Sequence, residues 1–394
     1  MMGKRTRVRP WFILAALALA RIGFGYQFQT VATLGPDLVP LFQLSYAAFG
    51  ALIGAYNILG VFTALPLGFL GRRFGDRPVL AGGLAFMVVG AVLDAAAQGP
   101  NGIALGRAVG GVGAVAMIVL QGKVIADWFS GRWFMVGISV SVCAYPIGVG
   151  LAQIALPPLA HRFGWQMAFL SDGVAPLLAL LLFLASYREP DAMAAGARDF
   201  SLPSRRECLL LIIAGLSWTA YTSGFSGYTG YVPSTLAARG ESVGLIALVM
   251  VIATWGNVPA TLWGGDLAAR FGALRIFLLG TLALVAGTLG TALTGAPLGW
   301  AFLVGVLGAI HPGVIMAVST LSAKPGNRAV GMGLFYSLYY LGGTVGPALC
   351  GWTADRMGGP EGGVIAAAVF SALTVPLFLW HRKLAHHETM LSRP

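Results

Sequence analysis

The apolar stretch WFILAALALARIGFGYQFQTVATL, residues 11–34, decides the class of fold, because it contains only one charged residue, Arg21. As a helix rising about 1.5 Å per residue it covers roughly 36 Å, which is enough to cross the hydrocarbon core of a bilayer. A helix also satisfies its own backbone hydrogen bonds in lipid. We therefore predict a transmembrane helix that holds Arg21 near the membrane centre, facing protein or a water-filled cavity.

Runs of this kind recur along the whole chain, which is 57% hydrophobic and only 10% charged. That composition excludes a soluble domain with a solvated surface. We predict an all-α membrane protein with twelve transmembrane helices, six on each side of a polar break. The predicted spans are 11–34, 45–70, 78–98, 102–126, 133–157 and 165–187, followed by 207–232, 243–269, 273–294, 297–322, 328–354 and 363–381.

The formal net charge of +11 is a topology signal rather than a nucleic-acid footprint. An even number of spans puts both termini on one side, and retained Lys and Arg mark the cytoplasmic side. Outside the spans, every basic residue except Arg162, Arg239 and Arg356 falls on the side of the termini. We therefore predict cytoplasmic termini, a first span that is retained rather than cleaved, an inner-membrane location and no nucleic-acid partner.

The sequence offers no pattern for catalysis or metal binding. Cys143, Cys208 and Cys350 show no paired spacing, so they predict neither a disulfide framework nor a zinc site. The histidine His311 has no second histidine three or four residues away, and HExxH and GxSxG motifs are missing from the chain. We predict a protein that is not an enzyme and needs no cofactor or metal.

An internal repeat divides the chain into two halves. GFLGRRFG at 68–75 returns as GDLAARFG at 265–272, a shift of 265 − 68 = 197 residues. A polar segment at 188–206 lies between the halves. We predict an N-terminal six-helix bundle at 1–187, a cytoplasmic linker at 188–206 and a C-terminal bundle with a short tail at 207–394. Duplications of this length are typical of transporters.

The repeated loop also resembles the glycine and arginine signature of the major facilitator superfamily. Positions matching that signature are Gly68, Leu70, Arg73, Gly75 and Arg77. Arg72 stands where the family usually has an aspartate, and a compensating contact through Asp76 or Asp127 stays open. The resemblance implies two pseudo-symmetric six-helix bundles, and gating or coupling roles for Asp76, Arg73 and Arg77.

A second match lies in the fourth span, where Arg107 precedes Gly110, Gly111, Gly113 and Ala114. Small residues of this kind allow close helix packing in membranes. Asp94 lies at a similar depth in the third span, which favours a structural ion pair with Arg107. Proton handling at Arg107 is the alternative that the resemblance implies. Asp94, Arg107 and Asp172 are therefore our candidate coupling residues, with His311 as a further titratable group.

The resemblance further implies that spans 1, 4, 7 and 10 line a central cavity. Arg21 in span 1 and His311 in span 10 are candidates on that map, although His311 could equally be a packing residue. The remaining candidates are polar or aromatic side chains from spans 2, 7, 8 and 11. Together the predicted substrate-binding residues are Arg21, Tyr56, Asn57, Tyr221, Trp255, His311, Tyr336 and Tyr339.

A guanidinium held inside the membrane suits carboxylate, nitrate-like or phosphate oxygens. We therefore predict a small, anionic solute, carried by a monomer that is embedded in the lipid bilayer, with protons as a candidate coupling ion. The short loops and the ADWF sequence at 126–129 look most similar to the cyanate permease and nitrate or small-carboxylate carrier branches of the superfamily. Alternatives are an exporter of a neutral or amphipathic compound and a non-transporting receptor on the same scaffold.

Overall fold

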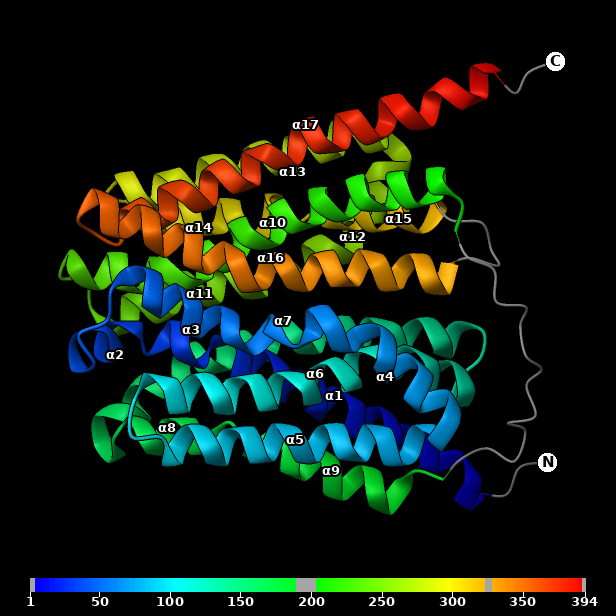
Figure 1. The fold of residues 1–394 in the computed structure, drawn as a ribbon, viewed down its shortest axis with the longest axis horizontal. Coiled ribbons are helices and arrows are strands. Elements are labelled where there is room, and N and C mark those ends of the chain that lie inside the picture. The colour runs from blue at the N-terminus through cyan, green and yellow to red at the C-terminus, as the bar shows by residue number, and fades with distance from the viewer. Residues whose placement is uncertain (1–3, 189–202, 323–327, 392–394) are drawn as a thin grey trace. The chain divides into compact units, whose positions relative to one another are not determined.

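The computed structural model describes residues 4–188, 203–322 and 328–391, and Figure 1 shows these residues as helices joined by short turns. Eleven helices within this described part are long and apolar enough to cross a membrane. The predicted span at 328–354 corresponds to α16, Arg328–Met357, which is long enough but less apolar than those eleven. The prediction of an all-α, multi-spanning membrane protein is confirmed.

The chain folds as two compact units. Unit 1 comprises residues 1–44 and 55–195, and unit 2 comprises residues 45–54 and 196–394. The start of the third helix, Ser45–Gly54, thus groups with unit 2. The predicted bundle boundaries remain a prediction, and most of the predicted linker at 188–206 lies outside the described residues.

The first half of the chain contains nine helices within the described residues. Their bounds are α1 Lys4–Thr33, α2 Gly35–Leu41, α3 Tyr46–Ile58, α4 Gly60–Phe74, α5 Asp76–Ala96, α6 Pro100–Trp128, α7 Arg132–Phe163, α8 Trp165–Ser171 and α9 Val174–Ser186. The second predicted span is divided into α3 and α4 at Leu59, and the sixth into α8 and α9 at Asp172 and Gly173. Proline and glycine near such breaks remove ladder hydrogen bonds or side chains.

The second half repeats part of this order, although its interruptions fall in other spans. Its elements are α10 Arg205–Ala238, α11 Val243–Trp255, α12 Asn257–Phe271, α13 Ala273–Leu293, α14 Pro297–Phe302, the π-helical turn η1 Leu303–Leu307, α15 Pro312–Leu321, α16 Arg328–Met357 and α17 Glu361–Leu391. Helices α11, α12 and α13 begin and end at the positions that the sequence repeat assigns to them from α3, α4 and α5, since 243 − 46 and 293 − 96 both equal 265 − 68. The repeat found in the sequence is therefore also a repeat of helix boundaries.

The turns that precede α5 and α13 depend on glycine. Gly75 has a φ of 89° and Gly272 a φ of 91°, and the repeat aligns these two residues with each other. Residues with a Cβ rarely adopt this left-handed conformation, whereas glycine does so freely. The glycine that ends the GRRFG and AARFG segments therefore sets the sharp reversal between two spans in each half.

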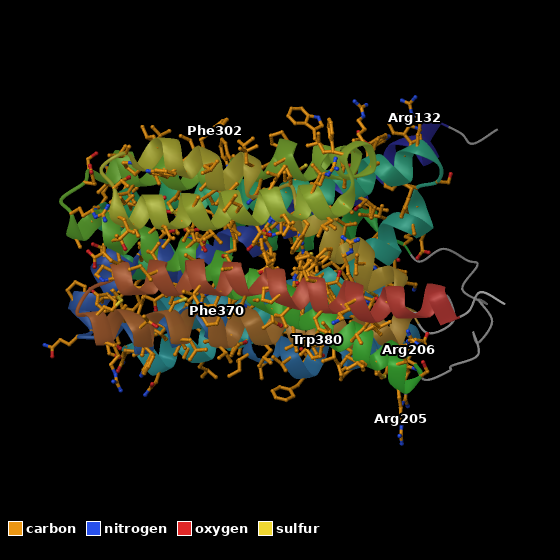
Figure 2. The ribbon with its side chains drawn as sticks, turned by 90° about the horizontal axis from the view of Figure 1, so that it is seen from above. Arg132, Arg205, Arg206, Phe302, Phe370 and Trp380 are labelled. Carbon is orange, nitrogen blue, oxygen red and sulfur yellow. The ribbon has the colours of Figure 1, made fainter. Side chains whose placement is uncertain are left out.

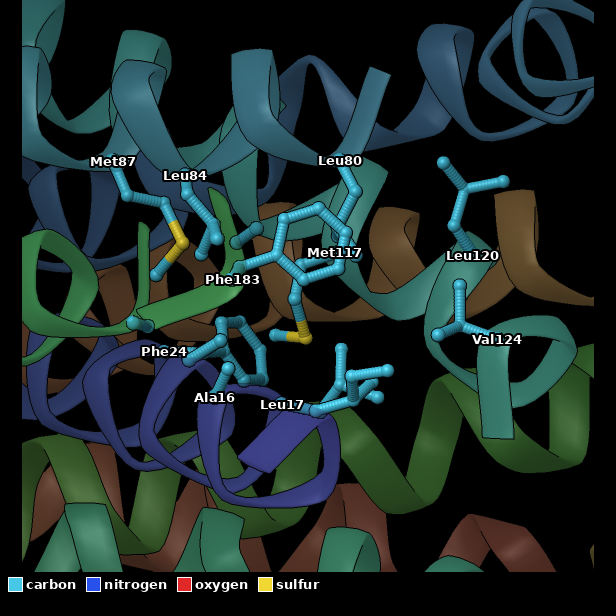
Figure 3. Close-up of a cluster of buried hydrophobic side chains, with 14 of the residues drawn as sticks. Ala16, Leu17, Phe24, Leu80, Leu84, Met87, Met117, Leu120, Val124 and Phe183 are labelled. Atoms are coloured by element: carbon cyan, nitrogen blue, oxygen red, sulfur yellow. The ribbon is translucent and has the colours of Figure 1, made fainter. Parts of the chain in front are cut away.

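The core of unit 1 lies where α5 and α6 pack against α1 and α9. Figure 3 shows Leu80, Leu84 and Met87 of α5 gathered with Met117 of α6 and Phe183 of α9. Glycines let the α5 and α6 backbones approach closely; a Cβ at Gly83 would lie only 2.8 Å from that of Ala116. Dispersion contacts of this kind replace the hydrophobic driving force between helices in lipid.

A core of unit 2 lies where α13, α15 and α17 meet. Phe277 of α13 stacks on Phe378 of α17 with ring centroids 3.8 Å apart, and both are buried with Val314 and Ile315 of α15. Outward-facing positions are apolar as well: Phe302 and Trp380 lie on the outside of the helices in Figure 2 and are exposed. An apolar exterior around a packed interior suits a chain surrounded by lipid.

Candidate functional site

Arg21 lies in α1 of unit 1 and is half-buried. Its guanidinium carbon lies 5.2 Å from the ring centroid of Phe24 and 5.5 Å from that of Tyr145, so two aromatic faces flank the charge. The Nε atom is buried and has no hydrogen-bond partner among the described residues. No ion pair to a carboxylate is formed by Arg21 in that part of the chain.

Close packing of α1 on α7 creates this environment. A Cβ at Gly25 would overlap the Tyr145 carbonyl, and a Cβ at Gly148 would overlap the Ile22 carbonyl. The absence of side chains at these two glycines brings the Tyr145 ring beside Arg21. Gly25 of α1 and Gly148 of α7 thus have a local use, because together they place an aromatic face against the charge.

Arg107, by contrast, is fully engaged. Its side chain is 1% exposed, and its two terminal nitrogens donate to the carbonyl oxygens of Gln27 at 3.0 Å and Phe28 at 3.1 Å. The Tyr56 ring covers the guanidinium carbon at 5.0 Å from its centroid. This arginine of α6 therefore ties that helix to α1.

A polar network surrounds Arg107. The Tyr56 hydroxyl donates to Gln27 Oε1 at 2.8 Å, and Gln27 Nε2 donates to the carbonyl oxygens of Met87 and Asp172 at 2.9 and 3.2 Å. The Thr30 hydroxyl donates to Asp172 Oδ1 at 2.9 Å. Asp172 is 2% exposed and stands at the break between α8 and α9. The network joins α1, α3, α5 and the α8–α9 break.

Asp94 of α5 completes this group. Its carboxylate interacts with the charge and the backbone N–H of Arg107, and its Oδ1 is buried without a hydrogen-bond partner among the described residues. The structure thus brings together the predicted residues Asp94, Arg107, Asp172 and Tyr56. Two carboxyl groups and one guanidinium share this interior, so their formal charges do not cancel when both acids are ionised.

The predicted residues of unit 2 gather around His311. This residue is fully buried, and its Nδ1 lies 2.8 Å from the Gly308 carbonyl oxygen. The ring packs edge-on against Tyr221, at 5.1 Å between centroids, and against Phe277, at 5.6 Å. His311 Nε2 is buried and has no partner in the described part of the chain.

An aromatic group continues from Tyr221 along α10 and α16. Trp218 lies 5.6 Å from Tyr221, 5.5 Å from Phe335 and 6.5 Å from Tyr339 between ring centroids. Tyr339 in turn contacts Tyr336 at 6.3 Å. We call the set His311, Trp218, Tyr221, Phe225, Phe277, Phe335, Tyr336, Tyr339 and Tyr340 the aromatic cluster.

Two further predicted binding residues lie near helix ends. Asn57 is buried at the end of α3, and Trp255 is 38% exposed at the end of α11.

Residues of the signature loop form a separate group: Asp76 is fully buried and pairs with Lys123 of α6 at 2.5 Å. Arg73 lies exposed beside Phe74, and Arg77 donates to the Leu184 carbonyl oxygen at 3.1 Å. Of the two contacts left open by the sequence, Asp76 makes the ion pair.

Three further residues of these groups are absent from the sequence predictions: Gln27, Thr30 and Lys123. Gln27 and Thr30 follow Arg21 in the same apolar span, and polar residues inside a span are uncommon enough to be a signal. Lys123 was assigned to topology alone, because only the fold shows it to lie against Asp76. Within the described residues, no group of three His, Cys, Asp or Glu side chains could hold a metal ion.

The fold and these buried polar groups define a multi-spanning membrane protein with charged residues in its interior. A family model described as Major Facilitator Superfamily matches residues 15–347 and 208–394, so the chain belongs to that superfamily. It is therefore a transporter of small solutes and not an enzyme.

Two curated relatives from Escherichia coli strain K12 match over most of their length. The inner membrane transport protein YajR is 24% identical over 93% of this chain and 82% of its own length, and the 3-(3-hydroxy-phenyl)propionate transporter is 27% identical over 90% and 89%. A bacterial homologue of the human lysosomal transporter Spinster has a similar fold, with a TM-score of 0.78 and 16% identity, covering 97% of this chain and 98% of that structure.

Proposed function

We propose that the protein carries a small organic anion across the inner membrane by alternating access, and that Arg21 binds the anionic group of the solute. The observation that supports this proposal most is the state of the guanidinium: it lies inside the membrane part of α1, with a buried Nε that has no protein partner among the described residues. A charge held in a membrane span without a protein partner is a functional-site hypothesis by default.

The contrast with Arg107 strengthens the argument. Arg107 donates to two carbonyl oxygens and is therefore accounted for as a structural residue. Arg21 has two aromatic faces beside it and no ion pair among the described residues, which leaves its planar N–H fork available for a carboxylate. The name of the 3-(3-hydroxy-phenyl)propionate transporter gives a carboxylate as the solute of that relative, in keeping with an anion here.

Uptake into proteoliposomes tests the proposal, starting with 3-(3-hydroxyphenyl)propionate and a panel of aliphatic carboxylates. We expect Arg21→Gln to lower uptake at least about 100-fold, because a charge-assisted bidentate contact is lost. Arg21→Lys should retain part of the activity. Arg162→Gln, at an exposed arginine of α7, is the control and should leave both uptake and melting temperature unchanged. Normal uptake by Arg21→Gln would contradict the proposal.

We propose in addition that a proton bound in the Arg107 network couples transport to the proton gradient. The groups that face the Asp172 carboxyl are Thr30 and Tyr26 of α1, Tyr56 of α3, Asp94 of α5 and Arg107 of α6. One guanidinium balances only one of two buried carboxylates, and an unbalanced buried charge is costly. Holding one proton on the pair relieves that imbalance.

Asp172→Asn tests the coupling step while keeping an oxygen that can accept the Thr30 hydroxyl bond. We expect the variant to exchange the solute downhill but to lose accumulation driven by an imposed pH gradient. Asp94→Asn and the double variant show which carboxyl group holds the proton. Unchanged gradient-driven accumulation in all three variants would contradict a coupling role for this network.

Uptake into the same proteoliposomes also distinguishes the proposed carrier from the two alternative functions, a receptor and an exporter. A receptor on this scaffold binds a solute without moving it, and an exporter of neutral compounds moves uncharged solutes in preference to carboxylates. The distribution of basic residues supports cytoplasmic termini, so a C-terminal tag should be reached by protease only from the cytoplasmic face.

A further inference from the structure

We infer that the anion carries a hydroxyl group on an aromatic ring, and that the aromatic cluster of unit 2 recognises this part of the solute through His311. This inference rests on the proposed function, because it specifies which organic anion the transporter selects. The supporting observations all lie in unit 2. They are the buried atoms His311 Nε2 and Trp218 Nε1, and the aromatic rings around them.

The hydrogen bond to Gly308 determines which His311 nitrogen is available. A backbone carbonyl oxygen can only accept, so the 2.8 Å contact requires the hydrogen to be on Nδ1. Neutral histidine then presents a lone pair at Nε2, which is an acceptor. This acceptor is buried and lacks a donor among the described residues, a state that proteins rarely leave uncompensated. A hydroxyl group of the solute is a donor of the required kind.

The backbone around His311 gives independent support. The tenth predicted span is interrupted: α14 ends at Phe302, the π-helical turn η1 covers Leu303–Leu307, and α15 begins only at Pro312. Single π-helical turns occur frequently at functional sites, and interrupted membrane helices often line the solute sites of transporters. His311 is the residue immediately before α15, so the interruption and the unsatisfied nitrogen coincide.

The rings around His311 indicate the shape of the group that it meets. Tyr221 and Phe277 present their rings nearly perpendicular to the imidazole, at 90° and 84°. Trp218 adjoins Tyr221, and its Nε1–H is buried without an acceptor among the described residues. A planar ring can pack between such faces, while its hydroxyl oxygen can accept from a donor such as this N–H. An aliphatic hydroxy acid would use the polar atoms but not the rings.

Close packing fixes the histidine in place. A Cβ at Gly280 of α13 would lie 2.9 Å from His311 Cβ and 3.1 Å from Nδ1. The missing side chain of Gly280 thus leaves the space that the imidazole occupies, and the hydrogen bond from Nδ1 to Gly308 sets the orientation of the ring. Nε2 is therefore held in one direction, as a recognition group must be.

The inference is tested with matched carboxylates and full-length protein in proteoliposomes. The pairs are 3-hydroxybenzoate with benzoate, 3-hydroxyphenylacetate with phenylacetate, and 3-hydroxycyclohexanecarboxylate with cyclohexanecarboxylate. We expect the wild type to prefer the hydroxylated member of an aromatic pair roughly tenfold, since one hydrogen bond to a buried group is gained. The cyclohexane pair should be transported poorly because it cannot use the rings.

Variants of His311 and Trp218 test which side chains produce the preference for hydroxylated carboxylates. His311→Phe should lower transport of the hydroxylated member to the rate of its deoxy partner in the same variant, and His311→Gln, which restores an acceptor, should recover part of the preference. Trp218→Phe should weaken the preference to a lesser degree. Melting temperatures confirm that each variant is folded. Equal transport of hydroxylated and deoxy partners by the wild type, or a preference unchanged in His311→Phe, would overturn the inference.

One further probe separates this test from that of the anion proposal. 3-Hydroxybenzyl alcohol keeps the phenolic hydroxyl but has no carboxylate. If it is transported as well as 3-hydroxybenzoate, and Arg21→Gln changes neither, the anion proposal fails while recognition at His311 stands. If carboxylates depend on Arg21 but hydroxylation has no effect, the anion proposal stands and the role of His311 fails.

Discussion

The two units share one helix pattern but differ in the chemistry of their interiors. Unit 1 encloses Arg21, Arg107, Asp94 and Asp172, whereas the interior of unit 2 around His311 consists of neutral aromatic side chains. One pair of equivalent positions shows this difference: the repeat aligns the buried, charged Arg107 with the buried, apolar Val304. The duplicated scaffold has thus kept the boundaries of α3–α5 in α11–α13, while the interiors of the two units differ.

The largest expected effect is that of removing Arg107 from the charged interior. Arg107→Leu leaves two buried carboxyl groups without their cation and frees the carbonyls of Gln27 and Phe28. Breaking a buried charge arrangement by removing one member costs about 3–5 kcal/mol. We expect a large fall in melting temperature or a failure to accumulate folded protein, measured by thermal unfolding in detergent.

The comparison becomes sharper with His311→Phe as the counterpart in unit 2. That variant retains a ring and loses one hydrogen bond to the Gly308 carbonyl, so a cost of about 1–2 kcal/mol is expected. Similar losses in the two variants would mean that the charged interior of unit 1 does not depend on its arginine, and the contrast between the units would fail.

A second prediction uses two glycines that the repeat aligns with each other, Gly83 and Gly280. At Gly83 an added Cβ meets Ala116 Cβ at 2.8 Å and the Gly113 carbonyl oxygen at 3.0 Å, whereas at Gly280 it meets the side chain of His311. Both alanine variants should lose about 1–3 kcal/mol of stability by overpacking. Only Gly280→Ala should also change the preference for hydroxylated aromatic carboxylates, because it displaces the imidazole.

Gly82→Ala is the matched control for this pair, since nothing lies within 4 Å of its added Cβ. Its melting temperature should equal or slightly exceed that of the wild type, as alanine is the better helix former. If Gly83→Ala alters solute preference as much as Gly280→Ala does, the assignment of selectivity to unit 2 is wrong.

The fold was predictable from sequence because lipid leaves the backbone few options. Long apolar runs must be helical, and the internal repeat predicted equivalent elements that the structure places at equivalent boundaries. The interruptions were not predictable. Leu59, Gly256 and the Gly308–His311 segment break their spans inside apolar sequence, where hydropathy has no signal, and the grouping of Ser45–Gly54 with unit 2 depends on tertiary packing.

The candidate site was predictable residue by residue but not as groups. The rarity of charge in the spans identified Arg21, Arg107, Asp94 and Asp172. Which of these have partners depends on distances between helices, so the engaged state of Arg107 and the unpartnered Nε of Arg21 required the structure. Their roles in transport remain predictions. Trp255, predicted from its position in the middle of a span, is 38% exposed and is the last residue of α11.

The smallest expected effect concerns the equivalent starts of α3 and α11. Ser45 and Ser242, which the repeat also aligns, each accept a backbone N–H from the first turn of their helix, Ala48 N at 3.1 Å and Leu245 N at 3.3 Å. Helix α3 has a second cap that α11 lacks among the described residues: the Asp355 carboxylate accepts the N–H groups of Tyr46 at 2.7 Å and Ala47 at 2.9 Å.

Loss of the serine should therefore matter less at α3 than at α11. Ser242→Ala removes the side-chain cap of α11 and should cost about 1 kcal/mol locally, whereas Ser45→Ala should cost less while Asp355 remains. Hydrogen exchange of first-turn amides measures both effects. In an Asp355→Ala background, Ser45→Ala should approach the effect of Ser242→Ala. Equal exchange in the two single variants would show that the aspartate contributes nothing, and that the start of α3 is held by packing against Tyr231 and Pro347 alone.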